Sequence, residues 1–283
     1  MAETAFQKQF RQETIAAFEV NQSLTRMTTT TEAVIKGNQA EFLVAGSGGA
    51  TAVTRGVNGM IPARGDDNQQ TTVTLVEWHD LVRKTRFNVE SSQGDQRSIM
   101  QRTTVGVMNR KIDDDIITEL NTGTVNTGTA AVASLALATR AKTILGNADV
   151  PFDGEIYALI SPAFEAYLHA TKEFASVDYV DMKATPDADL AYNGTQKMMR
   201  WLGVNWIVHP NLPGVGTNAE KCFMYHKSAI GHAMDAANLN TAAGYDEEQD
   251  YSFCRASCFM GTQLLQNSGV VVINHDGSAL AAA

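Results

Sequence analysis

The clearest helical pattern in the chain lies over residues 95–120. Its apolar residues recur at spacings of three and four: Val105, Met108, Ile112, Ile116 and Leu120. This spacing predicts one helix with a single apolar stripe along its length. Asp95 is suited to cap the start of this helix, and Asn121 with Gly123 to end it.

Ahead of this helix, two strand patterns enclose a glycine-rich stretch. Residues 41–45 favour a strand, and the return strand alternates, with Val73 and Leu75 on one face between threonines. The stretch between them contains Gly46, Gly48, Gly49, Gly56, Gly59, Pro62 and Gly65. The pattern predicts a large β-hairpin whose tip has too few large apolar residues to pack a core of its own. More strand-like sequence follows, from Trp78 to Val89.

The first forty residues combine an amphipathic helix pattern with a polar tether. One face of the helix would carry Phe6, Phe10, Ile15 and Phe18. The polar, β-branched run Thr28–Thr31 favours extended chain after it. The pattern fits a frayed tail with one apolar face; it also fits an arm that docks on a neighbouring molecule, which we favour.

From residue 125 onward, helix and strand patterns are mixed. A helix is predicted near 131–146, and Ser161 followed by Pro162 is typical of the start of another. The predicted strands are 156–160, 204–208, 223–225, 251–266 and 270–273. Together with the hairpin and the long helix, this organisation predicts an α+β fold.

Composition and charge narrow the function. The 283 residues include 22 basic and 31 acidic side chains, a formal net charge of −9. Proteins that grip nucleic acid normally carry a basic excess, so a sequence-specific DNA-binding protein is disfavoured. A container that must hold DNA without adhering to it is not excluded. No apolar run reaches the roughly 18 residues of a membrane helix. We expect no signal peptide, and we expect the cysteines to be reduced.

A zinc site is the most tempting candidate chemistry. Four side chains have the identities of zinc ligands: Cys222, His226, Cys254 and Cys258. Residues four apart on a strand lie roughly 13 Å apart, too far for one metal, which favours cysteines buried as small apolar residues. The sequence also has no P-loop, no H-E-x-x-H and no G-x-S-x-G motif. We therefore expect no enzyme activity, no cofactor and no metal.

Two short motifs favour equally plain interpretations. Aspartates 113–115 could suggest magnesium, but on a helix their side chains fan out at about 100° per residue. We expect them on a solvated or intersubunit charged face, with Arg110 and Lys111 placed for contacts with Asp114 and Asp115, in the weaker orientation. The cell-adhesion tripeptide at 64–66, Arg-Gly-Asp, arises easily by chance in a glycine-rich loop.

The order of these parts is more informative than any single motif. Three local strings matter as well: Asn-Arg-Lys-Ile-Asp-Asp at 109–114, Leu-Ile-Ser-Pro at 159–162 with Phe-Ala-Ser-Val-Asp-Tyr at 174–179, and Trp-Leu-Gly-Val-Asn-Trp-Ile-Val at 201–208. With the arm, hairpin, long helix, mixed domain and final strand, they resemble tailed-phage major capsid proteins of the Hong Kong 97-like fold. The similarity covers nearly the whole chain.

This resemblance implies a division of the chain into four parts. They are an N-terminal arm (1–40), an extended loop formed by the hairpin (41–76), a peripheral domain (77–124 and 266–283) with the spine helix 95–120, and an α/β axial domain (125–265). Subunit contacts are expected at Phe6, Phe10, Arg55, Arg64, Asp66, Arg110, Asp113 and Asp114.

The resemblance also implies a function. We expect a major capsid protein that assembles in the host cytoplasm into pentamers and hexamers and encloses double-stranded DNA in the virion. The implied partners are further copies of the chain and a portal protein. A separate scaffolding protein and a cement or decoration protein are further candidates, and no membrane is involved. Two alternatives stay open: another phage structural protein, of the tail or decoration type, and an α/β enzyme with an unrecognised site.

Some members of this fold join a lysine on the extended loop to an asparagine of a neighbouring subunit. In this chain no lysine lies between Lys36 and Lys84. The hairpin tip offers only Arg55 and Arg64, whose guanidinium groups stay protonated and cannot attack an amide. We therefore expect a shell that is not covalently cross-linked.

Overall fold

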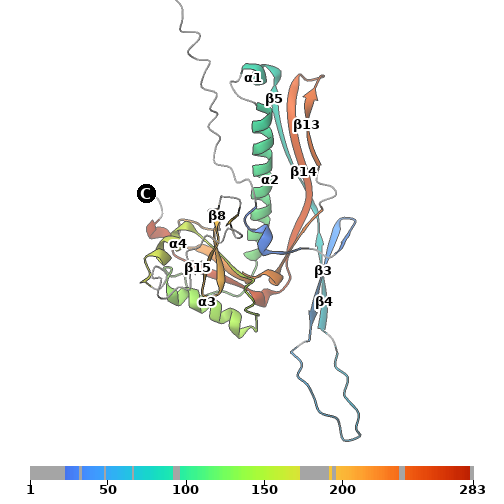
Figure 1. The fold of residues 1–283 in the computed structure, drawn as a ribbon, viewed down its shortest axis with the longest axis vertical. Helices are drawn as coiled ribbons and strands as arrows, with labels where there is room; N and C mark the ends of the chain where they lie inside the picture. Colours follow the sequence, from blue (N-terminus) through green and yellow to red (C-terminus); the bar gives the residue numbers. More distant parts are fainter. Residues whose placement is uncertain are drawn as a thin grey trace, which may run out of the picture.

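The fold is an elongated one in which a long helix and long strands extend one way and a hairpin the other (Figure 1). The structure is a computed structural model, and it describes residues 23–31, 34–47, 49–65, 67–91, 96–172, 191–192, 196–235 and 240–280. The predicted amphipathic helix with Phe6 and Phe10 lies outside the described residues.

The long helix is present, but its buried face differs from the prediction. The helices are α1 (Arg86–Ser91), α2 (Gln96–Leu120), α3 (Leu135–Asn147) and α4 (Pro162–His169), with short 3-10 turns η1 (Arg26–Thr28), η2 (Lys227–Ala229), η4 (Asn267–Gly269) and η5 (Ser278–Leu280). In α2, Ile112, Ile116 and Leu120 are buried as predicted. Val105 is 47% exposed, whereas Met100 and Thr104 are buried. Met100 and Thr104 are four residues apart, so they lie on one buried face of α2. Val105, directly after Thr104, therefore points toward solvent.

The mixed sheet carries most of the apolar core. Its strand order is β15-β11-β6-β10-β9, with bounds β6 (Ile156–Ile160), β9 (Met199–Trp201), β10 (Val204–Val208), β11 (Glu220–His226) and β15 (Val270–His275). The side chains of Trp206 and Phe164 stack at 6.2 Å between ring centroids inside this core. The start of α4 is as predicted, because Ser161 Oγ accepts the N–H of Phe164 at 3.1 Å and Pro162 is the first helical residue.

A second sheet packs against α2. It contains β1 (Thr30–Thr31), β5 (Val76–Thr85), β12 (Ile230–Met234), β13 (Asn240–Asp246) and β14 (Tyr251–Leu264). The long strand β14 is its centre: β5 pairs with one edge, and β13 and then β12 pair with the other. Figure 1 shows α2 lying along these strands.

The strand pairing crosses the expected division of the chain in two places. Strands β12–β14 fall in the predicted axial segment 125–265, yet β14 pairs with β5 beside the long helix, and β12 and β13 pair with β14. Conversely, β15 lies in the segment 266–283 predicted as peripheral, and it pairs with β11 in the mixed sheet. Residues 87–89, expected as strand, belong to α1. The local pattern predicts strands but not their distant partners, which backbone hydrogen bonding selects.

The hairpin forms as predicted. Its strands are β3 (Gln39–Gly46) and β4 (Asp67–Thr74), with β2 (Val34–Lys36) on the outer side of β3. The short strands β7 (Ala191–Tyr192) and β8 (Gln196–Lys197) form a separate pair. Ala40, Phe42 and Val73 make a small core with Ala233 where the hairpin meets β12. The predicted alternation of β4 is confirmed, because Val73 is buried while its threonine neighbours are exposed.

Candidate functional site

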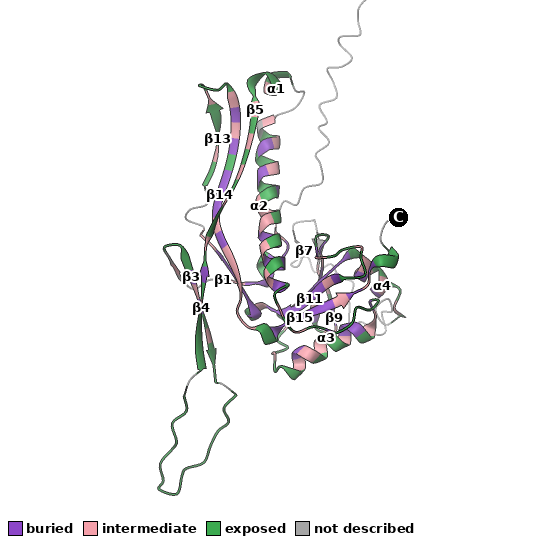
Figure 2. Cartoon of the chain, turned by 180° about the vertical axis from the view of Figure 1, so that it is seen from behind, coloured by how far each residue is buried: buried purple, intermediate pink, exposed green. Residues whose placement is uncertain are grey.

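The hairpin tip projects from the described part of the chain, and none of the described residues packs over it. Every described residue from 49 to 65 is exposed, and Figure 2 shows the tip green throughout. Four large apolar side chains there are between 63% and 107% exposed: Val53, Val57, Met60 and Ile61. Apolar side chains gathered on one exposed segment are typical of a surface that another molecule covers. The sequence predicts that the tip lacks a core, but the glycine-rich pattern alone gave no sign of this apolar cluster.

Local hydrogen bonds shape the tip. The N–H of Gly56 donates to the carbonyl of Met60 at 3.0 Å, and the N–H of Gly59 donates to that of Gly56 at 2.8 Å. Gly59 has φ +72°, a left-handed conformation that favours glycine. Arg55 and Arg64 are both exposed on this segment, whereas Asp66 lies outside the described residues. The described tip is thus an exposed apolar projection that carries two arginines.

Two glycines allow the root of the hairpin to pack closely against the second sheet. A Cβ atom on Gly231 would lie 2.8 Å from the ring of Phe42. A Cβ atom on Gly261 would lie 2.7 Å from Val73 Cγ1 and 2.9 Å from the backbone oxygen of Thr74. Real side chains do not approach this closely, so both positions require glycine. The two glycines form the slot that sets the direction of the hairpin.

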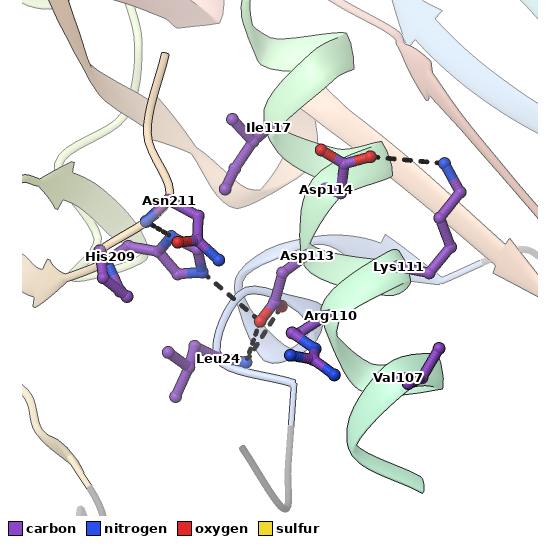
Figure 3. A pocket seen from close by; sticks show the side chains of 10 residues that line it. Leu24, Val107, Arg110, Lys111, Asp113, Asp114, Ile117, His209 and Asn211 are labelled. Atoms are coloured by element: carbon purple, nitrogen blue, oxygen red, sulfur yellow. Dashed lines mark hydrogen bonds and ion pairs between the residues drawn. The ribbon is translucent and has the colours of Figure 1, made fainter. Parts of the chain in front are cut away.

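A second site forms around Asp113, in the middle of α2. The side chain is 4% exposed, and its Oδ1 accepts hydrogen bonds from Ser23 Oγ at 2.5 Å and Thr25 Oγ1 at 2.7 Å. The backbone N–H groups of Leu24 and Thr25 also donate to this carboxylate, each at 3.1 Å. Asp113 therefore anchors the first described residues of the chain to the long helix (Figure 3).

His209, at the end of β10, completes the surroundings of this carboxylate. Its Nε2 lies 3.5 Å from Asp113 Oδ2, and its Nδ1 accepts the N–H of Asn211 at 3.2 Å. In a neutral imidazole that arrangement places the proton on Nε2, facing Asp113. Burial would raise the pKa of the Asp113 carboxyl, but hydrogen bonds from His209, Ser23 and Thr25 outweigh it and hold that pKa below its usual range. Asp113 is thus ionised at neutral pH.

Residues 23–31, which we call the arm base, are fastened at two further points. Thr28 Oγ1 donates to the carbonyl of Thr25, and it also bonds the hydroxyl of Tyr225 on β11. Thr30 Oγ1 donates to the carbonyl of Lys227 at 2.9 Å, and β1 pairs with β12. The arm base therefore connects the long helix to both large sheets. The predicted extended run at Thr28–Thr31 is only partly correct, because Thr28 lies in η1.

An open cleft of about 430 Å³ lies beside the anchor, between α2 and the chain that follows β10. Its walls include apolar Val107 and Ile117 and charged Arg110, Lys111 and Asp114. Lys111 Nζ lies 2.7 Å from Asp115 Oδ1, which confirms the predicted pair. Asp114 is exposed, as expected of a charged face, but Asp113 is not. The expectation for Asp113 is wrong because Ser23, Thr25 and His209, which surround it, are distant in sequence.

The cysteines lie within packed strands. All three are buried free thiols, with Cys222 on β11 and Cys254 and Cys258 on β14. Burial raises the pKa of the Cys222 thiol to about 12, so it stays protonated and is a poor metal ligand. In the described part of the chain, no group of three or more metal-ligating side chains comes together, and no helix is long and apolar enough to cross a membrane.

The chain is similar to known proteins both by family profile and by fold. A family profile described as "Phage capsid protein" matches residues 2–277. A structure from Mycobacterium phage Che8 has a TM-score of 0.72 at 18% identity, over 94% of this chain and 95% of that chain. The capsid of a native GTA particle (13% identity) and that of Ralstonia phage GP4 (11%) both give 0.65, over 93% of both chains in each case. No curated protein matches the chain significantly. The structural likeness at these identities shows a shared fold.

Proposed function

The chain belongs to the phage capsid protein family, and from this premise we propose that its copies assemble as pentamers and hexamers into an icosahedral shell around a double-stranded DNA genome. It is a major capsid protein, a structural component of the virion. The observation that best supports the assembly scheme is the hairpin tip, whose apolar side chains are left exposed by the described part of the chain and are suited to contact another copy.

We propose three groups of residues as subunit contacts. Arg55, Arg64 and Asp66 belong to the hairpin tip, and Arg110 with Asp114 borders the cleft beside α2. The arm contributes Phe6 and Phe10. A protruding loop and an arm suit a closed shell, because head-to-tail contacts between different surfaces generate rings. Asp113 is left out of this set, since its carboxylate is occupied within its own chain.

The proposed division of labour follows the strand pairing. We assign the hairpin as the extended loop and α2 with β5, β13 and β14 as the peripheral part. The mixed sheet with α3 and α4 would be the axial part. Beyond its own copies, we propose a portal protein as a partner, with a separate scaffolding protein and a cement protein as further candidates. The net charge of −9 suits a wall that encloses DNA without sequence-specific binding. We propose that the protein has no catalytic role. We also propose that it assembles in the host cytoplasm.

Assembly is the direct test of this proposal. The full chain, expressed alone and then together with the structural proteins of its phage, is expected to give capsomers or closed shells in negative-stain electron micrographs. The copies should also form the most abundant protein band of purified virions. A chain that stays monomeric at high concentration in both preparations, or one present in only a few copies per virion, would contradict the proposal. Low copy number would instead favour a tail component.

The shell is expected to be held by non-covalent contacts. The exposed tip from 49 to 65 carries no lysine, so no amine is placed there to form an isopeptide bond. Mature particles boiled in detergent with reductant should therefore give a single band near 30.6 kDa. A ladder of multiples that survives both treatments would show that a cross-link forms elsewhere in the chain.

A further inference from the structure

We propose that Asp113 is the release point of the N-terminal arm. While its carboxylate holds Ser23–Thr25, the arm base is attached to α2 from Ser23 onward. When that hold is lost, the first attached residue is Thr28. This inference rests on the proposed assembly function only for its consequence in the shell. The release itself is a property of the single subunit.

The arm base is attached to the rest of the chain at three points, which differ in the number of hydrogen bonds they make. The Asp113 anchor gathers two hydroxyl groups, two backbone N–H groups and His209 on one buried carboxylate. The next attachment point toward the C-terminus is the hydrogen bond between Thr28 and Tyr225, and the last is the pairing of β1 with β12. Each group at Asp113 depends on the negative charge, because hydrogen bonds to a charged acceptor are about twice as strong as neutral ones. A single change of charge therefore loosens the first attachment point and leaves the other two.

Release would lengthen the free arm by a defined amount. The chain from Ser23 to Met27 has five residues before the contact at Thr28. Five extended residues span at most about 17 Å. An arm that reaches this much farther can meet a different part of a neighbouring copy. The anchor thus selects between two arm lengths, and Asp113 is a positioning residue for assembly.

Asp113 also connects the arm to the relative placement of the long helix and the mixed sheet. His209 follows β10 in the mixed sheet, and its backbone N–H donates to the carbonyl of Ile160 on β6 at 2.8 Å. The same carboxylate on α2 faces this imidazole and the arm base. A shift of the mixed sheet relative to α2 would therefore move His209 away from Asp113 and weaken the hold on the arm.

Cleavage by trypsin after Arg26 measures the release in unassembled subunits. The N–H of Arg26 donates to Ser23 Oγ at 3.2 Å, and the N–H of Thr28 donates to the carbonyl of Thr25 at 2.9 Å. The two residues held by Asp113 thus also hold the start of η1, so the bond after Arg26 is protected while the anchor is formed. Asp113→Asn keeps the shape of the side chain and removes its charge. We expect cleavage after Arg26, followed by mass spectrometry of peptides whose N-terminus is Met27, to be at least tenfold faster in this variant.

Asp114→Asn is the matched control. It makes the same change of charge one residue away, on an exposed side chain, and should cleave at the parental rate. If Asp113→Asn does not fold, as judged by near-UV circular dichroism, Ser23→Ala combined with Thr25→Val removes the two hydroxyl donors instead. Equal rates in the parent, Asp114→Asn and whichever anchor variant folds would overturn the release point.

Shell geometry gives the second measurement. Shells of the anchor variant should vary more in diameter than shells of the parent, because the point at which the chain is first held differs among its copies. Shells of uniform parental diameter, formed by a variant that does cleave faster, would refute the role in assembly and leave the release itself standing. If the parent forms no shells at all, the proposed function fails, and cleavage after Arg26 still reports on the anchor.

Discussion

Replacing residues 47–66 by Asn-Gly is expected to abolish shell formation and to leave the subunit folded. The described part of this segment makes no packing contacts that bury it, so its loss removes little from the stability of the subunit. Asn-Gly is the two-residue turn that joins antiparallel strands best, and it would connect Gly46 to Asp67, which are paired across the hairpin. Shell yield by sedimentation and electron microscopy should fall below detection, while the unfolding midpoint changes by no more than a few degrees.

A second variant separates the length of the tip from its chemistry. A Gly-Ser segment of the same length keeps the reach of the hairpin but removes Val53, Val57, Met60, Ile61 and both arginines. If these side chains make the contact, this variant should also fail to assemble. Shells at the parental yield from either variant would show that the tip is dispensable and that assembly depends on other surfaces.

Gly261→Ala is expected to weaken both the subunit and its assembly. The added Cβ atom would meet Val73 Cγ1 at 2.7 Å and the backbone oxygen of Thr74 at 2.9 Å. Neither neighbour can shift without strain, because valine has a restricted χ1 angle and the oxygen belongs to the backbone of β4. Overpacking of this kind costs about 1–3 kcal/mol. We expect that loss in the free energy of unfolding from denaturant titration, together with a lower shell yield because the hairpin root is displaced.

The controls for this variant come from the same structure. Gly146→Ala lies in α3, where the added Cβ would meet the ring of Phe152 at an ordinary 3.5 Å. It should be neutral or stabilising by up to about 1 kcal/mol, as alanine favours helix. Adding Val73→Ala to Gly261→Ala should recover part of the shell yield by making room for the methyl group. A Gly261→Ala protein that unfolds and assembles like the parent would contradict the steric argument.

The site was harder to predict than the fold. The hairpin, its missing lysines and its arginines are visible in the sequence, because they depend on residues that lie close together along the chain. The anchor was not visible: Ser23 and Thr25 are 90 and 88 residues away from Asp113, and the run of three aspartates gives no sign that only the first is buried. The slot for the hairpin root was equally hidden, since an isolated glycine in a strand does not reveal what packs against it.

The local elements of this chain can be predicted from its residues alone. The periodicity of α2, the alternation of β4 and the Ser161–Pro162 start of α4 follow from side-chain spacing and backbone preference within a few residues. The pairing of β14 with β5, the pairing of β15 with β11 and the hold of one α2 carboxylate on the arm base emerge only when the chain folds. Local pattern acts through near neighbours, whereas strand partners and a buried charge are selected by hydrogen bonds between segments that only folding brings together.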